Sequence, residues 1–155
     1  MGSYFSYDDL TLLKGSENKQ LKSVLYHFWQ NKTNPSDFFE FTDKVELHFS
    51  DGTKLVLSST EDDEPAISVL KNFDAETSKL ELLHRFGGKI DQRTEIMTSD
   101  PLWKNVSGKT LAGVQLVDDG ENTYRNDAVL LDFRSEKIEI RPGVEGLIIE
   151  PFEDV

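Results

Sequence analysis

Apolar residues alternate with polar ones in the same way at two places in this chain, and this repetition severely limits its fold. In each copy an aspartate opens an apolar run, a polar turn follows, and a lysine opens a second run. The first copy contains Asp43, Val45, Leu47, Phe49, Lys54, Leu55 and Leu57, and the second contains Asp127, Val129, Leu131, Phe133, Lys137, Ile138 and Ile140. A period of two is typical of a strand that buries one face. Each copy therefore predicts a β-hairpin.

The correspondence extends beyond the hairpins in both directions. Upstream, the spacing of Lys19, Leu21 and Val24 recurs at Lys109, Leu111 and Val114. Downstream, residues 64–69 resemble residues 145–149, and each segment indicates a third strand after a Pro or Gly. This order predicts a single compact domain over residues 1–155, with repeat units at about 7–72 and 99–155 and a connector at 73–98. The alternative is a plain antiparallel β domain without duplication.

The alternation also assigns residues to the two faces of each strand. Glu46 and His48 in the first copy, and Asp132 and Glu139 in the second, fall on the outward face, opposite the apolar residues. The first turn contains Gly52, whereas the second turn, residues 134–136, is one residue shorter and lacks glycine. We therefore expect the two turns to differ in geometry.

The connector has two interpretations. A helix over residues 74–86 is favoured, because Asp74 suits an N-cap, Gly87 suits the position after the helix, and Leu80, Leu83 and Phe86 share one helical face. In the alternative, these residues form a strand and Gly87 begins a hairpin turn. Short helical turns are also expected near residues 7–14 and 99–105.

These patterns predict a mostly β fold of the β-rich α+β class, with two degenerate β-meander repeats and a short helix in the connection between them. Two meanders that each have one apolar face can bury those faces against each other as a sandwich. They can also join edge to edge as a partly closed barrel. The sequence leaves this choice open.

Charge and composition exclude several classes of partner. The net charge of -12 comes from 29 acidic and 17 basic residues, and it would repel a phosphate backbone, so no binding to nucleic acid is expected. No apolar run approaches the roughly 18 residues needed to cross a bilayer, so no membrane partner is expected. The chain contains no cysteine, which fits a reducing compartment, and the expected localisation is cytoplasmic.

The sequence gives little support for catalysis. The histidines, His27, His48 and His84, lack the spacing of a zinc motif, and no nucleophile elbow or phosphate-binding loop occurs. His48 and Asp132 occupy equivalent outward positions in the two copies, but such polar residues are usually solvated and without a catalytic role. We predict no catalytic residue, no metal site and no cofactor, and we favour a protein that is not an enzyme.

Acidic loops and aromatic residues are the candidate partner-binding features. The acidic clusters at residues 61–64 and 118–121 are typical of polar loops, and such loops can also face a basic protein. Most aromatic residues between 26 and 41 are expected to pack in the core, and any exposed ones would be interface anchors. The candidate residues are Asp62, Asp63, Asp118, Asp119, Tyr26 and Trp29.

Together these features favour a non-enzymatic protein-interaction module whose acidic loops bind a basic protein. The small, acidic, β-rich profile resembles that of bacterial immunity-type inhibitors, in composition and not in any motif. One alternative is a small-ligand-binding protein or enzyme that uses a groove between the repeats. Another is a homo-oligomeric structural subunit joined through edge strands, and the oligomeric state is left open.

Overall fold

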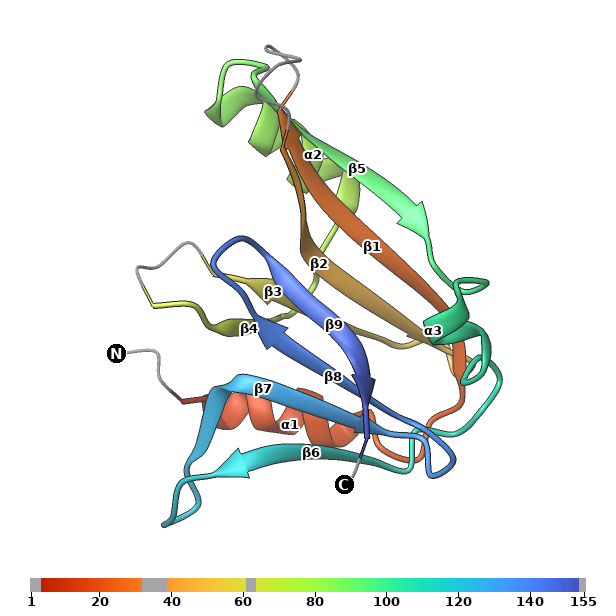
Figure 1. Ribbon diagram of the computed structural model, residues 1–155. Helices are drawn as coiled ribbons and strands as arrows, with labels where there is room; N and C mark the ends of the chain where they lie inside the picture. The colour runs from red at the N-terminus through yellow and green to blue at the C-terminus, as the bar shows by residue number, and fades with distance from the viewer. Residues whose placement is uncertain (1–3, 32–38, 61–63, 154–155) are drawn as a thin grey trace.

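The computed structural model describes residues 4–31, 39–60 and 64–153, which form two antiparallel sheets (Figure 1). The first sheet has five strands in the order β4-β3-β2-β1-β5, and the second has four in the order β6-β7-β8-β9. The elements are α1 (Tyr7–Gly15), β1 (Leu21–Asn31), β2 (Glu40–Phe49), β3 (Lys54–Ser59), β4 (Ile67–Leu70), α2 (Ala75–Arg85), β5 (Ile90–Ile96), α3 (Pro101–Lys104), β6 (Gly113–Asp118), β7 (Tyr124–Asp132), β8 (Lys137–Pro142) and β9 (Leu147–Phe152).

A helix followed by a four-stranded meander occurs twice along the chain, as α1 with β1 to β4 and as α3 with β6 to β9. The two sheets are not closed into a barrel, and their inner faces share one apolar cluster. The predicted fold class, a β-rich α+β fold of two meanders with a short helix between them, is confirmed in its sandwich form. The boundaries of the repeat units remain an interpretation of the sequence.

The two meanders also use the same pairing register. The residues of the two predicted hairpins pair with equivalent partners on both sides of the central strands β2 and β7. The equivalent pairs are Val24–Leu47 and Leu47–Leu55 in the first sheet, and Val114–Leu131 and Leu131–Ile138 in the second. A shift of one residue would turn every side chain to the opposite face, so the shared register fixes the same inner face in both sheets.

The segments that lead into β1 and β6 join the two meanders through their main chains. Gln20 and Thr110 form an isolated antiparallel bridge. The Leu21 N–H donates to the Lys109 carbonyl at 2.9 Å, and the Leu111 N–H donates to the Lys19 carbonyl at 2.8 Å. The sequence repeat matches Lys19 with Lys109 and Leu21 with Leu111. The two hydrogen bonds are therefore related by the symmetry of the repeat.

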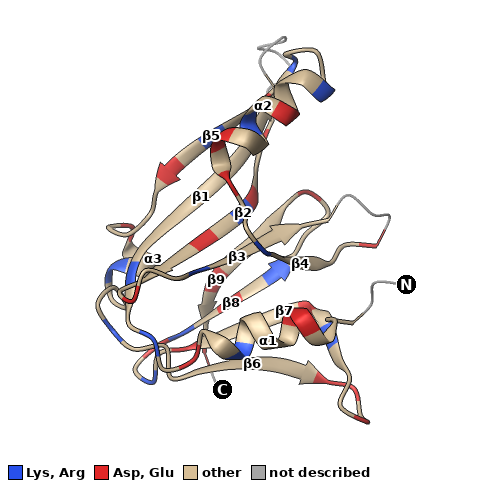
Figure 2. Cartoon of the chain, turned by 180° about the vertical axis from the view of Figure 1, so that it is seen from behind, with Lys and Arg blue, Asp and Glu red and all other residues tan. Residues whose placement is uncertain are grey.

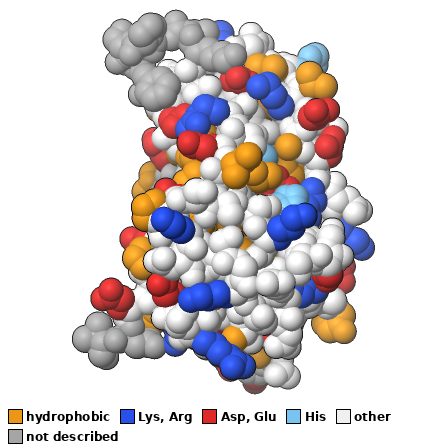
Figure 3. Space-filling view, turned by 90° about the vertical axis from the view of Figure 1, so that its right-hand side faces the viewer, with side chains coloured by type: hydrophobic (Ala, Val, Ile, Leu, Met, Phe, Trp, Pro, Cys, Tyr) orange, Lys and Arg blue, Asp and Glu red, His pale blue; other side chains and the backbone are white. Residues whose placement is uncertain are grey.

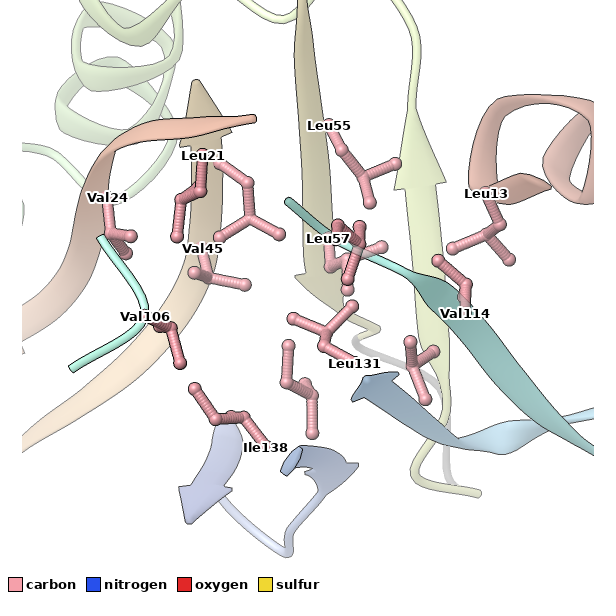
Figure 4. Packing of buried hydrophobic residues seen from close by; sticks show 14 of the residues in the cluster. Leu13, Leu21, Val24, Val45, Leu55, Leu57, Val106, Val114, Leu131 and Ile138 are labelled. Atoms are coloured by element: carbon pink, nitrogen blue, oxygen red, sulfur yellow. The ribbon is translucent and has the colours of Figure 1, made fainter. Parts of the chain in front are cut away.

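The core lies between the inner faces of the sheets (Figure 4). Both sheets contribute buried residues, among them Leu21, Val24, Val45, Leu47, Leu55, Leu57, Val114, Val129, Leu131, Phe133, Ile138 and Ile140. Leu13 of α1 and Trp103 of α3, both fully buried, add to this cluster. The alternation therefore predicted the inner faces correctly. No helix in the described parts of the chain is long and apolar enough to span a bilayer.

The connector forms a helix, α2, and the hairpin alternative is wrong. Asp74 is the N-cap and accepts from the Thr77 N–H at 3.2 Å, while Gly87 has a φ of 60° just past the helix end. Of the residues expected to share one helical face, Leu80 is 68% exposed and Leu83 and Phe86 are half-buried, while the buried residue of the helix is Leu82. Two hydrogen bonds determine which side of α2 faces β5. The Ser78 hydroxyl donates to the side chain of Gln92, and the Gln92 amide donates to the Ala75 carbonyl.

Gly146, in the turn between β8 and β9, marks a close approach of the two sheets. Its φ is +72°, and a Cβ there would lie 2.3 Å from the Thr42 carbonyl oxygen on β2. Gly120, in the turn between β6 and β7, has a φ of +92° but open space around the same position. Substitutions at Gly120 and Gly146 therefore distinguish the cost of a left-handed backbone alone from that cost plus a clash between the sheets.

We predict that Gly146→Ala destabilises the protein by on the order of 3 kcal/mol, because it adds a steric clash to a left-handed backbone. Gly120→Ala should cost about 1–2 kcal/mol from the backbone alone. Urea unfolding of both variants measures the difference. Equal losses would contradict the close packing of the β8–β9 turn on β2.

Candidate functional site

The structure separates the predicted partner-binding residues into three environments. Asp118 and Asp119 are exposed at the end of β6 and in the turn that follows it. Tyr26 is buried and Trp29 is half-buried, both on β1. Asp62 and Asp63 lie outside the described residues. The C-terminal end of β1, where Trp29 lies, is next to α2 and far from the β6–β7 turn (Figure 1). Trp29 and the two aspartates therefore do not form one surface.

Hydrogen bonds hold the acidic β6–β7 turn in one shape. The Asp118 carboxylate accepts from the Gly120 N–H at 2.8 Å, and the Asp119 carboxylate accepts from the Tyr4 hydroxyl at 2.6 Å. The Asp119 N–H donates to the Thr123 carbonyl at 2.9 Å, which closes the turn. Two aspartates are therefore presented on a fixed backbone.

The tip of this turn carries left-handed backbone at consecutive residues. Gly120, Glu121 and Asn122 have φ angles of 92°, 51° and 63°. Glycine adopts this region freely, but the Cβ of Glu121 makes it unfavourable there by roughly 1–2 kcal/mol. The hydrogen bonds around the turn hold Glu121 in this conformation, with its carboxylate at the exposed tip.

Charge is unevenly distributed between the two ends of the sandwich. Asp and Glu gather at the β6–β7 turn and in the first turn of α1, where Asp8 and Asp9 lie, on the same side as the N-terminus (Figure 2). We call this region the acidic end. Lys and Arg gather around α3 and the turns at the opposite end, and they lie across the middle and lower parts of the face seen in Figure 3.

Tyr26 belongs to the core and is not available as an interface anchor. It is 8% exposed, and its hydroxyl accepts from the Trp103 indole N–H at 2.6 Å. Burial raises the pKa of Tyr26 to about 12. The tyrosine therefore links β1 to α3 instead of facing a partner.

Trp29 lies on the outer face of the first sheet, beside α2. Its ring centroid is 5.6 Å from that of Phe41 and 6.1 Å from that of Phe86, and the Lys44 ammonium lies 6.0 Å from the indole centroid. A small hollow of about 200 Å³ opens next to Trp29 and Lys44, with Ser78, Leu82 and Arg85 of α2 on its other side. Trp29 thus mainly packs α2 onto the sheet.

A larger hollow lies elsewhere, between α3, the β7–β8 turn and the end of β9. It measures about 630 Å³, and its lining includes Leu102, Asn105, Lys137 and Phe152. All of these residues belong to the second predicted repeat unit. The hollow is therefore not the groove between the repeats that the sequence suggested for a ligand.

The outer face of the first sheet carries a buried polar cluster that the alternating sequence pattern does not reveal. His27 on β1 is fully buried, and its Nε2 donates a hydrogen bond to the carboxylate of Glu46 on β2. Its Nδ1 shares a hydrogen bond of 2.8 Å with the Thr94 hydroxyl on β5. A single imidazole therefore connects three adjacent strands.

Two further groups complete this cluster around Glu46. The Lys54 ammonium lies 3.3 Å from the second carboxylate oxygen of Glu46 and donates to the Phe73 carbonyl at 2.7 Å. The Phe73 ring covers His27, with a centroid distance of 5.3 Å. Lys44 and Lys54 lie 5.5 Å and 5.7 Å from the centre of the same ring. Lys54 thus contacts both Glu46 and the ring that covers His27, whereas Lys44 contacts the ring and pairs with Asp43.

The surroundings of Glu46 have opposing effects on its pKa. Burial raises it, but the hydrogen bond and charge of His27, together with the Lys54 ammonium, lower it more, so the pKa lies below its ordinary value of 4.5. The carboxylate is therefore held in its charged form, although Glu46 is only 3% exposed.

The sequence correctly placed Glu46 on the outer face but wrongly suggested that this face is open to solvent. The segment from β4 to α2 brings Phe73 across it, which a period of two cannot reveal. His48 lies 3.5 Å from Glu46, whereas Asp132 accepts from the Arg134 N–H at 2.7 Å. These contacts lie in different sheets, so they do not support the suggested pairing of His48 with Asp132.

The cluster couples strands, and its histidine and carboxylate are closed to solvent. Within the described ranges, no group of three or more His, Asp or Glu residues is arranged to hold a metal ion. The exposed acidic end is therefore the better candidate for contact with another molecule, and the buried cluster is a source of stability.

We predict that Glu46→Gln lowers stability at neutral pH by about 1–3 kcal/mol, because it leaves His27 and Lys54 without a charged partner. Since the folded pKa is lowered, the carboxylate stabilises the fold above pH 4.5 and this stability is lost as the pH falls through the folded pKa. The gap between wild type and variant should therefore narrow in acid. Unfolding at several pH values tests this, with Glu121→Gln as the control for losing an exposed carboxylate. A gap that stays constant would contradict the assignment.

Comparisons with known proteins bring no relative to this chain. No protein-family model matches it, and no curated protein or solved structure gives a significant match.

Proposed function

We propose that this chain is a non-enzymatic protein-interaction module whose acidic end binds a basic protein. The observation that carries the proposal is the β6–β7 turn, where Asp118, Asp119 and Glu121 are exposed on a backbone fixed by hydrogen bonds. An immunity-type inhibitor of a basic partner is one protein of this kind, and the composition agrees with it.

A rigid acidic turn favours association in two ways. Its backbone is ordered before binding, so little conformational entropy is lost when a partner docks. Its carboxylates add to the field of a chain with net charge -12, which attracts a basic surface and raises the association rate. The Lys and Arg residues at the opposite end orient the molecule in the field of the partner (Figure 2).

We predict that Asp118→Asn together with Asp119→Asn slows association with a basic partner by roughly three- to tenfold at low salt, mainly through kon. Asparagine keeps an oxygen that can accept from Gly120 and Tyr4, so the turn should stay folded. Stopped-flow or surface-based kinetics with a purified partner measures the rate at two salt concentrations. The difference between wild type and variant should shrink at physiological salt, where the Debye length is about 8 Å.

The matched control is Glu76→Gln together with Glu81→Gln, which removes two exposed carboxylates from α2, away from the acidic end. This control should slow association less than the turn variant. Equal slowing by both variants would mean that net charge alone matters, and it would contradict a role for the β6–β7 turn.

A further inference from the structure

The two sheets have four edge strands, and three of them are protected against pairing with another chain. On β6, the Val114 N–H donates to Glu17 and the Val114 carbonyl accepts from Lys14, both side chains near the end of α1. On β9, Pro151 replaces a main-chain donor. The β4 strand is only four residues long. Side-chain caps, prolines and short edges are the usual ways to prevent strand addition.

The fourth edge strand, β5, is seven residues long and regular. The Met97 N–H, just past its end, donates to the Val24 carbonyl on β1, so odd-numbered residues direct their main-chain groups toward β1. Even-numbered residues therefore direct theirs outward. The Gln92 carbonyl agrees with this, because it accepts from the Lys79 side chain. This bond of 3.3 Å is longer than the 2.6 Å between Lys14 and the Val114 carbonyl, and in the pairing proposed below the Ile96 N–H of a second copy takes its place. The outward groups of Thr94 and Ile96 continue the same edge.

We propose that β5 pairs with β5 of a second copy of this chain, antiparallel across a twofold axis at Thr94. The pairing would join the two five-stranded sheets into one continuous sheet. Outward groups must face outward groups across the new ladder, so even-numbered residues pair with even-numbered ones. Registers centred on Gln92, Arg93 or Thr94 meet this condition.

Charge selects among these registers. Within one copy Arg93 already bonds Glu40 and Glu95. Centred on Thr94, the pairing adds the Glu95 of the second copy opposite Arg93, and the reverse pair forms by symmetry. Centred on Arg93, it places Arg93 opposite itself and Asp91 opposite Glu95, which are like charges directly across a ladder. Centred on Gln92, it places Asp91 opposite Arg93, but it also brings two Lys79 ammonium groups to the axis, because each is bonded to a Gln92 carbonyl.

An exposed apolar side chain fits the same register. Ile96 is 72% exposed at the end of β5. In the proposed pairing it lies opposite Gln92 of the second copy, on the sheet face beneath the first turn of α2. A hollow of about 360 Å³ lies there, lined by Ala75, Lys79, Gln92 and Thr94 among others. The isoleucine of each copy therefore fills the hollow of the other.

Sedimentation equilibrium of the full chain at physiological ionic strength tests the dimer, because salt screens the repulsion between two acidic copies. We expect dimers at micromolar concentrations and a dimer dissociation constant at least about tenfold higher for Ile96→Lys. The matched control is Leu80→Lys, which changes a similarly exposed residue, 68% exposed on α2, and should leave the constant unchanged. A wild type that stays monomeric at high micromolar concentrations, or equal effects of both substitutions, would overturn the proposal.

Cross-linking tests the register, and the absence of native cysteine makes single substitutions unambiguous. Residues 93 and 95 would face each other as a non-hydrogen-bonded pair, whose short separation suits a disulfide. Under mild oxidation we expect a covalent dimer when Arg93→Cys and Glu95→Cys proteins are mixed, and little when either is oxidised alone. Near-ultraviolet circular dichroism verifies that both variants are folded. A covalent dimer from one variant alone, or none from the mixture, would overturn the Thr94 axis.

Discussion

Each of the two sheets has one face that can leave water only by packing against the other sheet, and the rest of the molecule is arranged around this requirement. The inner residues of β2 and β7 are flanked by apolar residues on both neighbouring strands, so one apolar cluster spans both meanders. Leu13 and Trp103 extend it from the two short helices that precede the meanders. The main-chain bridge at Gln20 and Thr110 then fixes how the two halves meet.

The inner faces could be predicted because a period of two carries their information locally. Val45, Leu47 and Phe49, and their counterparts in the second copy, needed no knowledge of the rest of the fold. The helix after Asp74 could likewise be predicted, because its cap and its terminal glycine are local signals. The side of the helix that faces the sheet could not be predicted. It depends on hydrogen bonds to Gln92, which lies on β5, further along the chain, and these bonds leave Leu80 exposed and Leu82 buried.

The buried cluster was beyond the sequence for a related reason. His27 and Glu46 occupy positions that are usually solvated on a two-layer sandwich, and only the passage of Phe73 across the sheet closes them off. The acidic end is the reverse case. The acidic run predicted an exposed loop at Asp118 and Asp119, and the structure adds the hydrogen bonds of that loop, while it places Tyr26 in the core. The buried histidine and carboxylate thus hold β1, β2 and β5 together, whereas the aspartates of the β6–β7 turn face solvent.

The bridge between the two meanders also has a consequence for the order of folding. Each meander consists of neighbouring hairpins, whereas the hydrogen bond from the Gln20 side chain to the Gly108 carbonyl joins residues 88 positions apart. Closing such a long loop is entropically costly, so local hairpins are expected to form first and the two meanders to dock afterwards. The indole of Trp103 on α3 donates to the hydroxyl of Tyr26 on β1. Its fluorescence should therefore report the packing of α3 on the first sheet, while Trp29, on the outer face, reports the packing of α2.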